Sequence, residues 1–151
     1  MDAIDRDILR HLQADGRLSN AALARRVGLS PTPTLRRVRA LERAGVLRGY
    51  HAEVDPHAVG RGFRVLVWVN LASGTRATIE AFERSLAEID EVVEALRLYG
   101  DPDYLLRVAV ADSDAYEVLY TNRLAALPGV DKARSQMAMK TVKRSLALPV
   151  D

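Results

Sequence analysis

The spacing of apolar residues differs between the first 44 residues of this chain and the remainder. Ile4, Ile8 and Leu12 recur at the intervals of a helix, and two further short segments before residue 45 show the same period. Residues 63–72 instead carry apolar side chains at alternating positions, which is typical of a β-strand. This change of period predicts a small helical unit followed by a separate unit of strands and helices, so the expected fold class is α+β.

Two helices with clear end signals are predicted first. One spans residues 4–13 and ends before Gly16. The other spans residues 20–27, with Ser19 as its N-cap and Gly28 as its C-cap, where a left-handed backbone conformation has no steric cost for glycine. The tight turn after Gly28 leads directly into a third helix.

The third predicted helix runs from residue 31 to residue 44. Ser30 is expected to accept hydrogen bonds from exposed amides as its N-cap, and Pro31 suits the first helical position because its missing N–H is not needed there. The predicted apolar side consists of Leu35, Val38 and Leu41, with Thr34 beside them. The opposite side and its flanks carry Thr32, Arg36, Arg37, Arg39 and Arg43, so four arginines are expected on one solvent-facing surface.

Basic charge is concentrated at this end of the chain. Residues 1–50 hold ten Arg against five Asp or Glu, a net charge of +5, whereas residues 51–151 hold 12 basic against 15 acidic residues, a net charge of −3. Two helices joined by a glycine turn, the second starting with hydroxyl residues and carrying outward arginines, form the arrangement that enters the major groove of DNA. Double-stranded DNA is therefore the expected partner, although an arginine-rich solvated surface would also explain the charge. The residues expected to contact DNA are Ser19, Asn20, Ser30, Thr32, Pro33, Arg36, Arg37, Arg39, Arg43 and Arg48.

The segment after the third helix predicts a wing. Residues 45–56 place β-branched and aromatic residues between glycines, as a small hairpin followed by an exit strand would. Arg48 would then approach the DNA backbone. The N-terminal unit is thus predicted to be a winged helix-turn-helix at residues 1–50, followed by a linker or exit strand at residues 51–61.

The remaining residues, 62–151, read as one domain with the element order βαββαβ. The predicted elements are a strand at 63–72, a helix at 79–89, strands at 92–99 and 104–110, a helix at 115–124 and a strand at 130–142. This order predicts a ferredoxin-like sandwich, an antiparallel sheet with two helices on one face. Leu66 and Trp68 lie opposite the helix-packing residues, so the free face is expected to meet a second subunit in a homodimer.

The turn between the two central strands carries two carboxylates beside a glycine. Gly, Asp and Pro are what any turn favours, so residues 99–104 are explained equally well by turn geometry alone. Alternatively, carboxylates could receive a ligand ammonium group while a glycine amide holds its carboxylate. A divalent-metal site of Asp101, Asp103 and Asp112 is conceivable, but oxygen ligands without a recognised spacing are a weak signal, and no metal site is assigned.

Several other classes of protein are not indicated. The chain has no cysteine for a thiolate metal site, and His11, His51 and His57 form no catalytic set of recognisable spacing, so neither an enzyme nor a cofactor-binding protein is expected. No charged-then-apolar leader precedes Ile4, and no apolar run approaches the roughly 18 residues of a membrane span. We therefore expect a cytoplasmic protein without a membrane partner.

Taken together, these segments resemble the leucine-responsive regulator/asparagine-regulator (Lrp/AsnC) family, also called feast/famine regulators. The resemblance in the first half rests on DRDIL at residues 5–9, GRLS at 16–19, VGLSPTP at 27–33, RV at 37–38, LERAGV at 41–46 and GY at 49–50. In the second half it rests on GDPDYLL at residues 100–106 and LPGV at 127–130. The resemblance covers nearly the whole chain, and the combination is specific although each piece is not.

Membership of that family would imply a transcriptional regulator whose C-terminal domain binds an amino acid or related metabolite at subunit junctions. Dimers of the family often assemble further, commonly into octamers. Carried over by position, the resemblance places the effector-binding residues at Gly100, Asp101, Asp103, Tyr104, Ser113, Ser135, Gln136 and Ala138. The alternative is an architectural protein that wraps DNA with little or no ligand control.

Overall fold

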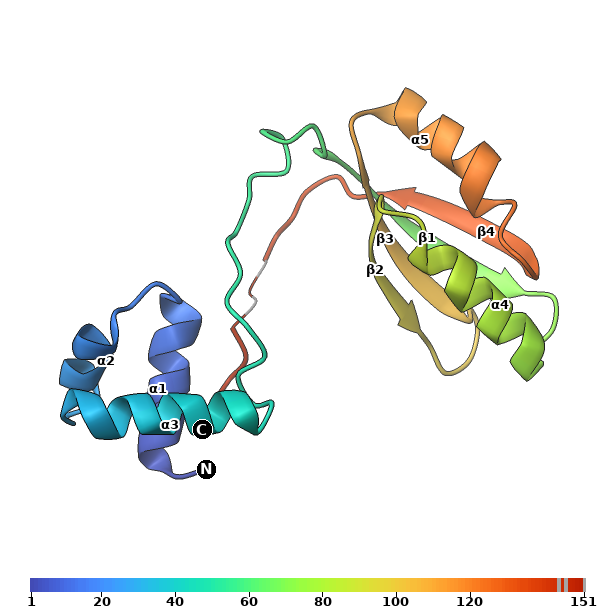
Figure 1. Cartoon of the computed structure of the whole chain (residues 1–151). Coiled ribbons are helices and arrows are strands. Elements are labelled where there is room, and N and C mark those ends of the chain that lie inside the picture. The colour runs from blue at the N-terminus through green and yellow to red at the C-terminus, as the bar shows by residue number, and fades with distance from the viewer. Residues whose placement is uncertain (144, 146, 151) are drawn as a thin grey trace. The chain divides into compact units, whose positions relative to one another are not determined.

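The computed structural model describes residues 1–143, 145 and 147–150. The chain forms two compact units (Figure 1): residues 1–53 together with the described residues from 142 onward make one, and residues 54–141 make the other. Each unit has a hydrophobic core of its own.

Three helices build the N-terminal unit, as predicted: α1 (Ala3–Ala14), α2 (Asn20–Arg26) and α3 (Pro31–Arg43). Their buried core consists of Ile8, Leu9, Leu12, Leu23, Val38 and Leu41. Helix α1 starts with a reciprocal cap, in which the Asp5 amide donates to the Asp2 carboxylate and the Asp2 amide donates to the Asp5 carboxylate. Such a cap satisfies two amides that have no partner inside the helix.

The predicted caps of α2 and α3 are formed in part. Ser19 accepts a hydrogen bond from the Ala22 amide, and Gly28 has the left-handed backbone conformation expected of a C-cap, with φ +69°. Ser30 occupies the N-cap position of α3, but its side chain accepts no capping hydrogen bond within the described chain, which corrects the prediction. The side-chain amide of Asn20 donates to the Pro31 carbonyl instead and ties the starts of α2 and α3 together.

The hairpin predicted at residues 45–56 is not formed in the structure. These residues, all described, form turns and irregular backbone without a strand. The reason lies in the end of α3, because the amides of Val46 and Leu47 both donate to the Leu41 carbonyl and so satisfy the helix terminus instead of pairing in a hairpin. Tyr50 then packs beside Gly16 and donates its hydroxyl to Glu42.

The end of the chain packs on the N-terminal unit. The side-chain amide of Gln13 donates to the Leu148 carbonyl and accepts from the Leu148 amide. Arg10 donates to the Val150 carbonyl, and Val150 packs against the helical core. A segment more than 130 residues away in sequence therefore completes the surface of α1.

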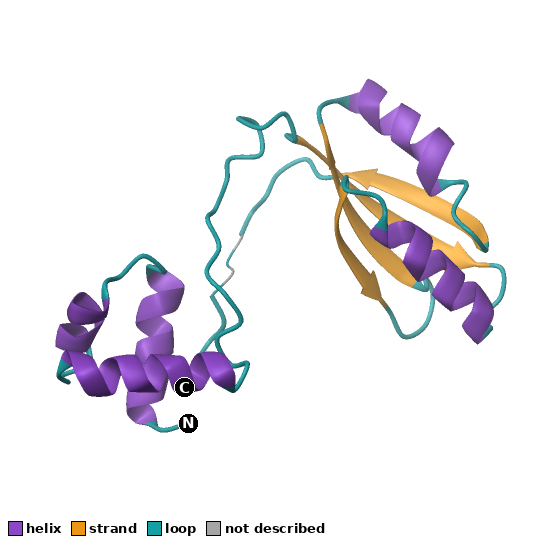
Figure 2. Ribbon diagram, in the orientation of Figure 1, coloured by secondary structure: helices purple, strands orange, loops and turns teal. Residues whose placement is uncertain are grey.

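The second unit is the predicted ferredoxin-like sandwich (Figure 2). Its elements are β1 (Phe63–Leu71), α4 (Arg76–Ala87), β2 (Val92–Arg97), β3 (Tyr104–Val110), α5 (Ser113–Leu119) with a following π-helical turn (Tyr120–Leu124), and β4 (Val130–Met137). The sheet is antiparallel with the order β2-β3-β1-β4, and both helices cover the same face. The last strand ends at Met137, five residues earlier than predicted.

Strand β1 shows how the two faces of this sheet differ. Val65, Val67 and Val69 are buried in the core with Phe82 and Leu86 of α4, and residues of β3 complete the core. Leu66 and Trp68 point to the opposite face and are half-buried. We refer to this second face, which no helix of the described unit covers, as the open face. None of the helices in the described residues is long and apolar enough to cross a membrane.

Candidate functional site

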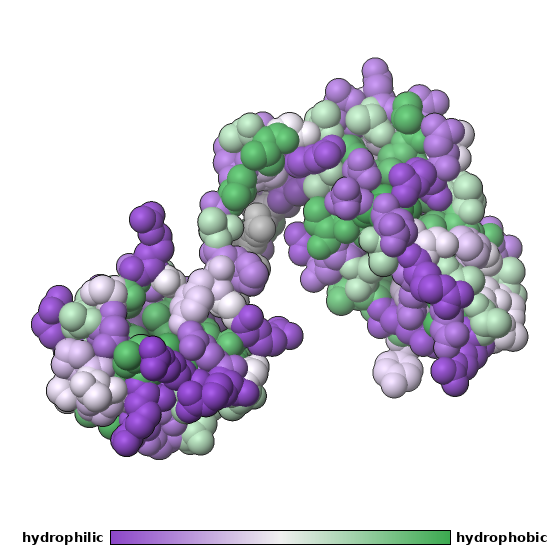
Figure 3. Space-filling view, in the orientation of Figure 1, coloured by the Kyte–Doolittle hydropathy of each residue, from purple (hydrophilic) through white to green (hydrophobic). Residues whose placement is uncertain are grey.

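Helix α3 presents three arginines to solvent. Arg36, Arg39 and Arg43 are exposed, and none of them forms a hydrogen bond or an ion pair within the described part of the chain. Figure 3 shows hydrophilic side chains over the face of this unit on which α3 lies. These three guanidinium groups are free to bind an external partner.

Arg37 differs from its neighbours, which revises the expected surface of four arginines. Its Nη1 donates to Asp2 at 2.7 Å and to Asp5 at 2.8 Å, so the side chain joins α3 to the start of α1. The hydrogen bonds that Arg37 donates to Asp5 and Asp2 raise the pKa of Arg37. The pKa of Asp2 is lowered, first by the amide of Asp5 and then by Arg37.

The structure partly revises the predicted apolar side of α3. Thr34 is completely buried, because its hydroxyl donates to the Ser30 carbonyl and is satisfied within the helix. Leu35, predicted on the apolar side, is 37% exposed. The outward surface of α3 therefore includes an apolar contact position beside the arginines.

The other residues predicted to contact DNA fall into two groups. Thr32 and Ser30 are exposed at the start of α3, Arg48 is exposed in the segment after it, and Pro33 is half-buried. The side chain of Ser19 caps the start of α2, and the side chain of Asn20 ties the start of α2 to the start of α3. The side-chain oxygen Oδ1 of Asn20 is buried and accepts no hydrogen bond within the described residues.

This surface has the chemistry of a major-groove reader. A guanidinium group can donate two parallel hydrogen bonds to guanine or bind a phosphate, and hydroxyl groups at a helix N-terminus can contact phosphates. Because the arginines recur along one side of a short exposed helix, they can act together on one groove.

The turn between β2 and β3 is organised by Asp103. Its amide donates to the Val69 carbonyl, its carbonyl accepts from the Leu98 amide, and its carboxylate accepts from the Leu71 amide at 2.8 Å. The pairing of β1 with β4 is irregular between Asn70 and Leu71, which leaves the Leu71 amide for this carboxylate. Asp103 is therefore a structural residue of the turn.

Asp101 is held as well, although it is exposed. Its carboxylate accepts a hydrogen bond from the side-chain amide of Asn70, and the peptide bond between Asp101 and Pro102 is cis. Gly100 has φ +102°, a conformation that strongly favours glycine. The turn thus has a fixed backbone, and its two carboxylates are bound by groups of the same unit.

A shallow cavity of about 300 Å³ lies beside this turn on the open face. It is lined by Trp68, Pro102, Arg134 and Gln136. Trp68 donates its indole N–H to the Gln136 side chain at 2.8 Å, while Arg134 has no hydrogen bond or ion pair to any described residue. A free guanidinium beside an indole and a proline ring suits a ligand that has a carboxylate and an apolar side chain.

Two of the predicted effector-binding residues face the other side of the sheet. Tyr104 is buried among the core residues and donates its hydroxyl to Glu83. Its pKa is raised to about 12, mainly by burial and then by the Glu83 carboxylate. Ser135 shares a hydrogen bond with the Tyr116 hydroxyl of α5. Neither side chain lines the open-face cavity, whereas Gln136 does.

Two further predicted residues lie at the other end of the sheet. β3 runs from the turn to residue 110, and Ser113 begins α5 beyond its far end. The Ala138 amide donates to the Arg64 carbonyl, near the pair Phe63 and Val110 and remote from the turn. One chain therefore does not bring Ser113 or Ala138 to the turn residues.

The conceivable metal site of Asp101, Asp103 and Asp112 is not formed. Asp112 caps α5 by accepting from the Ala115 amide, at the opposite end of β3 from the other two carboxylates. The described residues contain no group of three His, Cys, Asp or Glu side chains placed to hold a metal ion.

Arg134, Pro102 and Asn70 were missed at the sequence level. Two residues share a face when they are two apart in a strand, so Gln136 on the open face implied Arg134 beside it. To place Arg134 beside Trp68, one would also have needed to know that these two residues pair across β1 and β4. That register depends on the fold and is not visible in either strand alone.

Comparison with known proteins gives consistent matches over both units. Residues 1–48 match the family described as winged helix-turn-helix DNA-binding, and residues 64–148 match the Lrp/AsnC ligand binding domain. The leucine-responsive regulatory protein of Escherichia coli K12 is 43% identical over 150 residues, which cover 99% of this chain and 92% of that protein.

Solved structures agree with these matches. A transcriptional regulator of Neisseria meningitidis in complex with L-Met has a TM-score of 0.95 at 35% identity, covering all of this chain and 97% of the other. An AsnC family transcriptional regulator from Agrobacterium tumefaciens has a TM-score of 0.93 at 41% identity, covering 99% of this chain and 97% of the other. All three proteins are regulators, and none is described as an enzyme.

Proposed function

The chain belongs to the Lrp/AsnC family of DNA-binding transcriptional regulators, and from this premise we propose that it reads specific DNA sequences with α3 and responds to an amino acid or related metabolite. The observation that carries the proposal is the row of exposed, unpartnered arginines on α3: Arg36, Arg39 and Arg43. A regulator of this kind acts where the chromosome is, so we place it in the cytoplasm.

DNA binding would combine two kinds of contact. One or two of the α3 arginines donate hydrogen bonds to base edges and specify sequence, and the others bind phosphates and supply affinity that falls with salt. Thr32 and Ser30, which are exposed at the N-terminus of the same helix, would contact phosphates. Arg48 adds a phosphate contact from the segment after α3.

The effector site is proposed at the open-face cavity beside the β2–β3 turn. Arg134 would bind the carboxylate of an amino acid, and Trp68 and Pro102 would contact its side chain. Gln136 would orient the indole and offer its amide to the ligand. The complex of the Neisseria relative with L-Met supports an amino acid as the ligand class.

Assembly is proposed to connect the two functions. The open face carries Leu66 and Trp68 and extends to Leu96, a surface that a second copy would bury in a homodimer. Ser113 and Ala138 lie too far from the turn to act with it inside one chain, so a second copy would have to bring such residues to the site. Association of dimers, up to an octamer, would then depend on the effector and would set the spacing of the DNA-binding units.

Footprinting of the full chain on its own promoter region, with and without each amino acid, tests this proposal. We expect a sequence-specific footprint that one amino acid or keto acid changes in extent or spacing. A broad footprint that no ligand changes would favour an architectural DNA-wrapping protein instead. Arg134→Gln should lose the ligand response and keep the footprint, whereas Arg84→Gln, which removes an exposed unpartnered arginine from α4, should keep both.

A further inference from the structure

Helix α3 exposes one large apolar side chain beside its arginines. Leu35 is 37% exposed and lies outside the hydrophobic core of its unit. The other exposed side chains of the helix are charged, small or hydroxyl-bearing, or belong to proline: Pro31, Thr32, Arg36, Arg39, Ala40, Glu42 and Arg43. Single exposed leucines are common on protein surfaces, so the surroundings of Leu35 decide what it can do.

The neighbours of Leu35 on the helix surface are polar. Residues three or four apart adjoin each other on a helix, which places Thr32 on one side of Leu35 and Arg39 on the other. Both are exposed, and Arg39 has no hydrogen-bond or ion-pair partner in the described chain. A partner that covers Leu35 therefore also meets a hydroxyl group and an unpaired guanidinium group.

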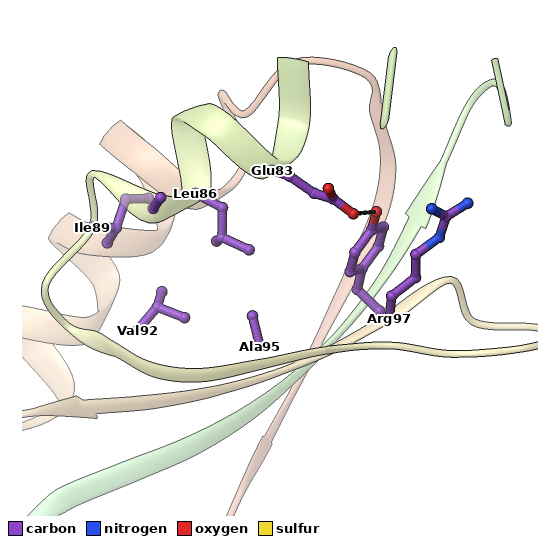
Figure 4. A pocket seen from close by; sticks show the side chains of 8 residues that line it. Glu83, Leu86, Ile89, Val92, Ala95 and Arg97 are labelled. Carbon is purple, nitrogen blue, oxygen red and sulfur yellow. Dashed lines mark hydrogen bonds between the residues drawn. The ribbon is translucent and has the colours of Figure 1, made fainter. Parts of the chain in front are cut away.

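Apolar side chains near the surface of the sandwich are placed differently. Leu86, Ile89 and Val92 line one cavity between α4 and β2, where they have one another as apolar neighbours (Figure 4). Leu35 differs from them, because its exposed neighbours along α3 are Thr32 and Arg39 rather than apolar side chains. Its exposed surface is thus available to an apolar group of another molecule.

The major groove of DNA offers the groups that this combination of side chains needs. Guanine presents two acceptors there and phosphates line its edges, so both can bind a guanidinium group. The C5-methyl group of thymine is the apolar group that projects into the same groove. A protein surface that covered Leu35 would instead have to supply an anion for Arg39, because burial of an unpaired guanidinium group is costly.

We infer that Leu35 determines specificity by contacting the C5-methyl group of a thymine in the major groove. The inference rests on the proposed binding of DNA by α3 and adds to it a residue that selects a base without a hydrogen bond. Cytosine lacks the methyl group, so the contact favours thymine over cytosine at one position for each bound α3. Because an apolar contact releases no counterion, its contribution should be the same at low and high salt, unlike that of arginines bound to phosphates.

Replacement of single thymines by deoxyuridine tests the inference, since the two bases differ only in the C5-methyl group. The probe is a synthetic duplex of the promoter segment that the full chain protects in footprinting, and fluorescence anisotropy measures binding. We expect deoxyuridine at one thymine for each bound α3 to weaken binding about fourfold, which corresponds to the burial of one methyl group. At the other thymines the affinity should not change.

A variant connects this loss to Leu35. Leu35→Ala should bind the unmodified duplex about fourfold more weakly, and deoxyuridine at the sensitive position should cause it no further loss. Val46→Ala, which truncates a side chain that is 49% exposed after the end of α3, is the matched control and should keep the full sensitivity to deoxyuridine. The deoxyuridine series with the unaltered chain decides the question alone if Leu35→Ala does not fold.

A second pair of duplexes isolates the methyl group in a different base. Cytosine and 5-methylcytosine, placed in turn at the sensitive position, differ only at C5. The unaltered chain should bind the duplex with 5-methylcytosine about fourfold more tightly. Leu35→Ala should bind the two duplexes equally.

Two results would overturn the inference. One is unchanged affinity of the unaltered chain when each thymine in turn is replaced by deoxyuridine. The other is equal sensitivity of Leu35→Ala and the unaltered chain to deoxyuridine, which would assign the methyl contact to a different residue. If Leu35→Ala also changed the oligomeric state in sedimentation velocity, Leu35 would lie in a contact between protein chains instead.

The same measurements separate this inference from the proposed function. If Arg36→Ala weakens operator binding while no thymine is sensitive to deoxyuridine, only the Leu35 contact is contradicted. If the full chain gives no sequence-specific footprint, both the DNA reading by α3 and the Leu35 contact are contradicted.

Discussion

Helix α3 and the β2–β3 turn both carry charged residues that were predicted to bind a partner. Those of α3 are unpaired in the described chain, whereas those of the turn are hydrogen-bonded within their own unit. On α3, Arg36, Arg39 and Arg43 have no partner in the described chain and are exposed. In the turn, Asp101 and Asp103 already accept hydrogen bonds from Asn70 and from the Leu71 amide. The difference shows that the α3 arginines keep their full hydrogen-bonding capacity for a partner, whereas the two turn carboxylates already spend part of theirs on the fold.

The largest effect is expected when one of the free arginines of α3 is removed. Arg36→Ala and Arg43→Ala should each weaken operator binding by about 1–3 kcal/mol if the lost contact is to a base. Fluorescence anisotropy with labelled operator DNA at two salt concentrations measures the loss and separates base contacts from phosphate contacts. Wild-type affinity in both variants would show that α3 does not face DNA.

The Asp103 carboxylate, which accepts a hydrogen bond from the Leu71 amide, should instead affect the stability of the fold. Asp103→Ala leaves the Leu71 amide without its acceptor, so the free energy of unfolding should fall by about 1 kcal/mol. Urea unfolding followed by circular dichroism measures this change, and Asp90→Ala, which removes an exposed carboxylate without a partner in the described chain, is the control. Equal stability of the two variants would assign Asp103 to the surface rather than to the turn.

The smallest effect is expected for Arg37, which lies on α3 like the free arginines but is paired with Asp2 and Asp5. Arg37→Ala should lower the stability of the helical unit at neutral pH, with less effect on operator affinity than Arg36→Ala has.

The pH dependence of that loss follows from Asp2. Its pKa is lowered in the folded chain, first by the Asp5 amide and then by Arg37, so the associated stability is present above its ordinary pKa of 3.8 and disappears as pH falls through the lowered value. Unfolding midpoints of Arg37→Ala and the unaltered chain should therefore converge in acid. A difference that persists below the lowered pKa of Asp2 would contradict the ion pair as its cause.

Much of the fold was predictable because it follows from periodicity. The three N-terminal helices and the ferredoxin-like order were confirmed, since helical and strand spacing are local properties of the sequence. The predicted hairpin of the wing is not formed because the Val46 and Leu47 amides donate to the Leu41 carbonyl at the end of α3. The local sequence pattern does not indicate this contact. Leu35, predicted on the apolar side of α3, is 37% exposed, whereas Thr34, predicted beside it, is fully buried and its hydroxyl donates to the Ser30 carbonyl, which removes the cost of burying it.

The candidate effector site was predictable only as a region. The turn at residues 100–104 was located, yet Tyr104 and Ser135 face the helices, because neighbouring residues in a strand point to opposite sides. Arg134 was missed because its position beside Trp68 depends on the register between β1 and β4. Such register is set by the whole sheet, and single strands do not contain it.

The packing of the last residues on α1 has a consequence for how the protein is made. Leu148 binds Gln13, and Val150 packs against the core of the three helices. Translation delivers those helices first, but the contacts that complete their unit emerge from the ribosome only after the entire sandwich between them. Synthesis of the helical unit therefore starts before that of the sandwich and is completed only after it.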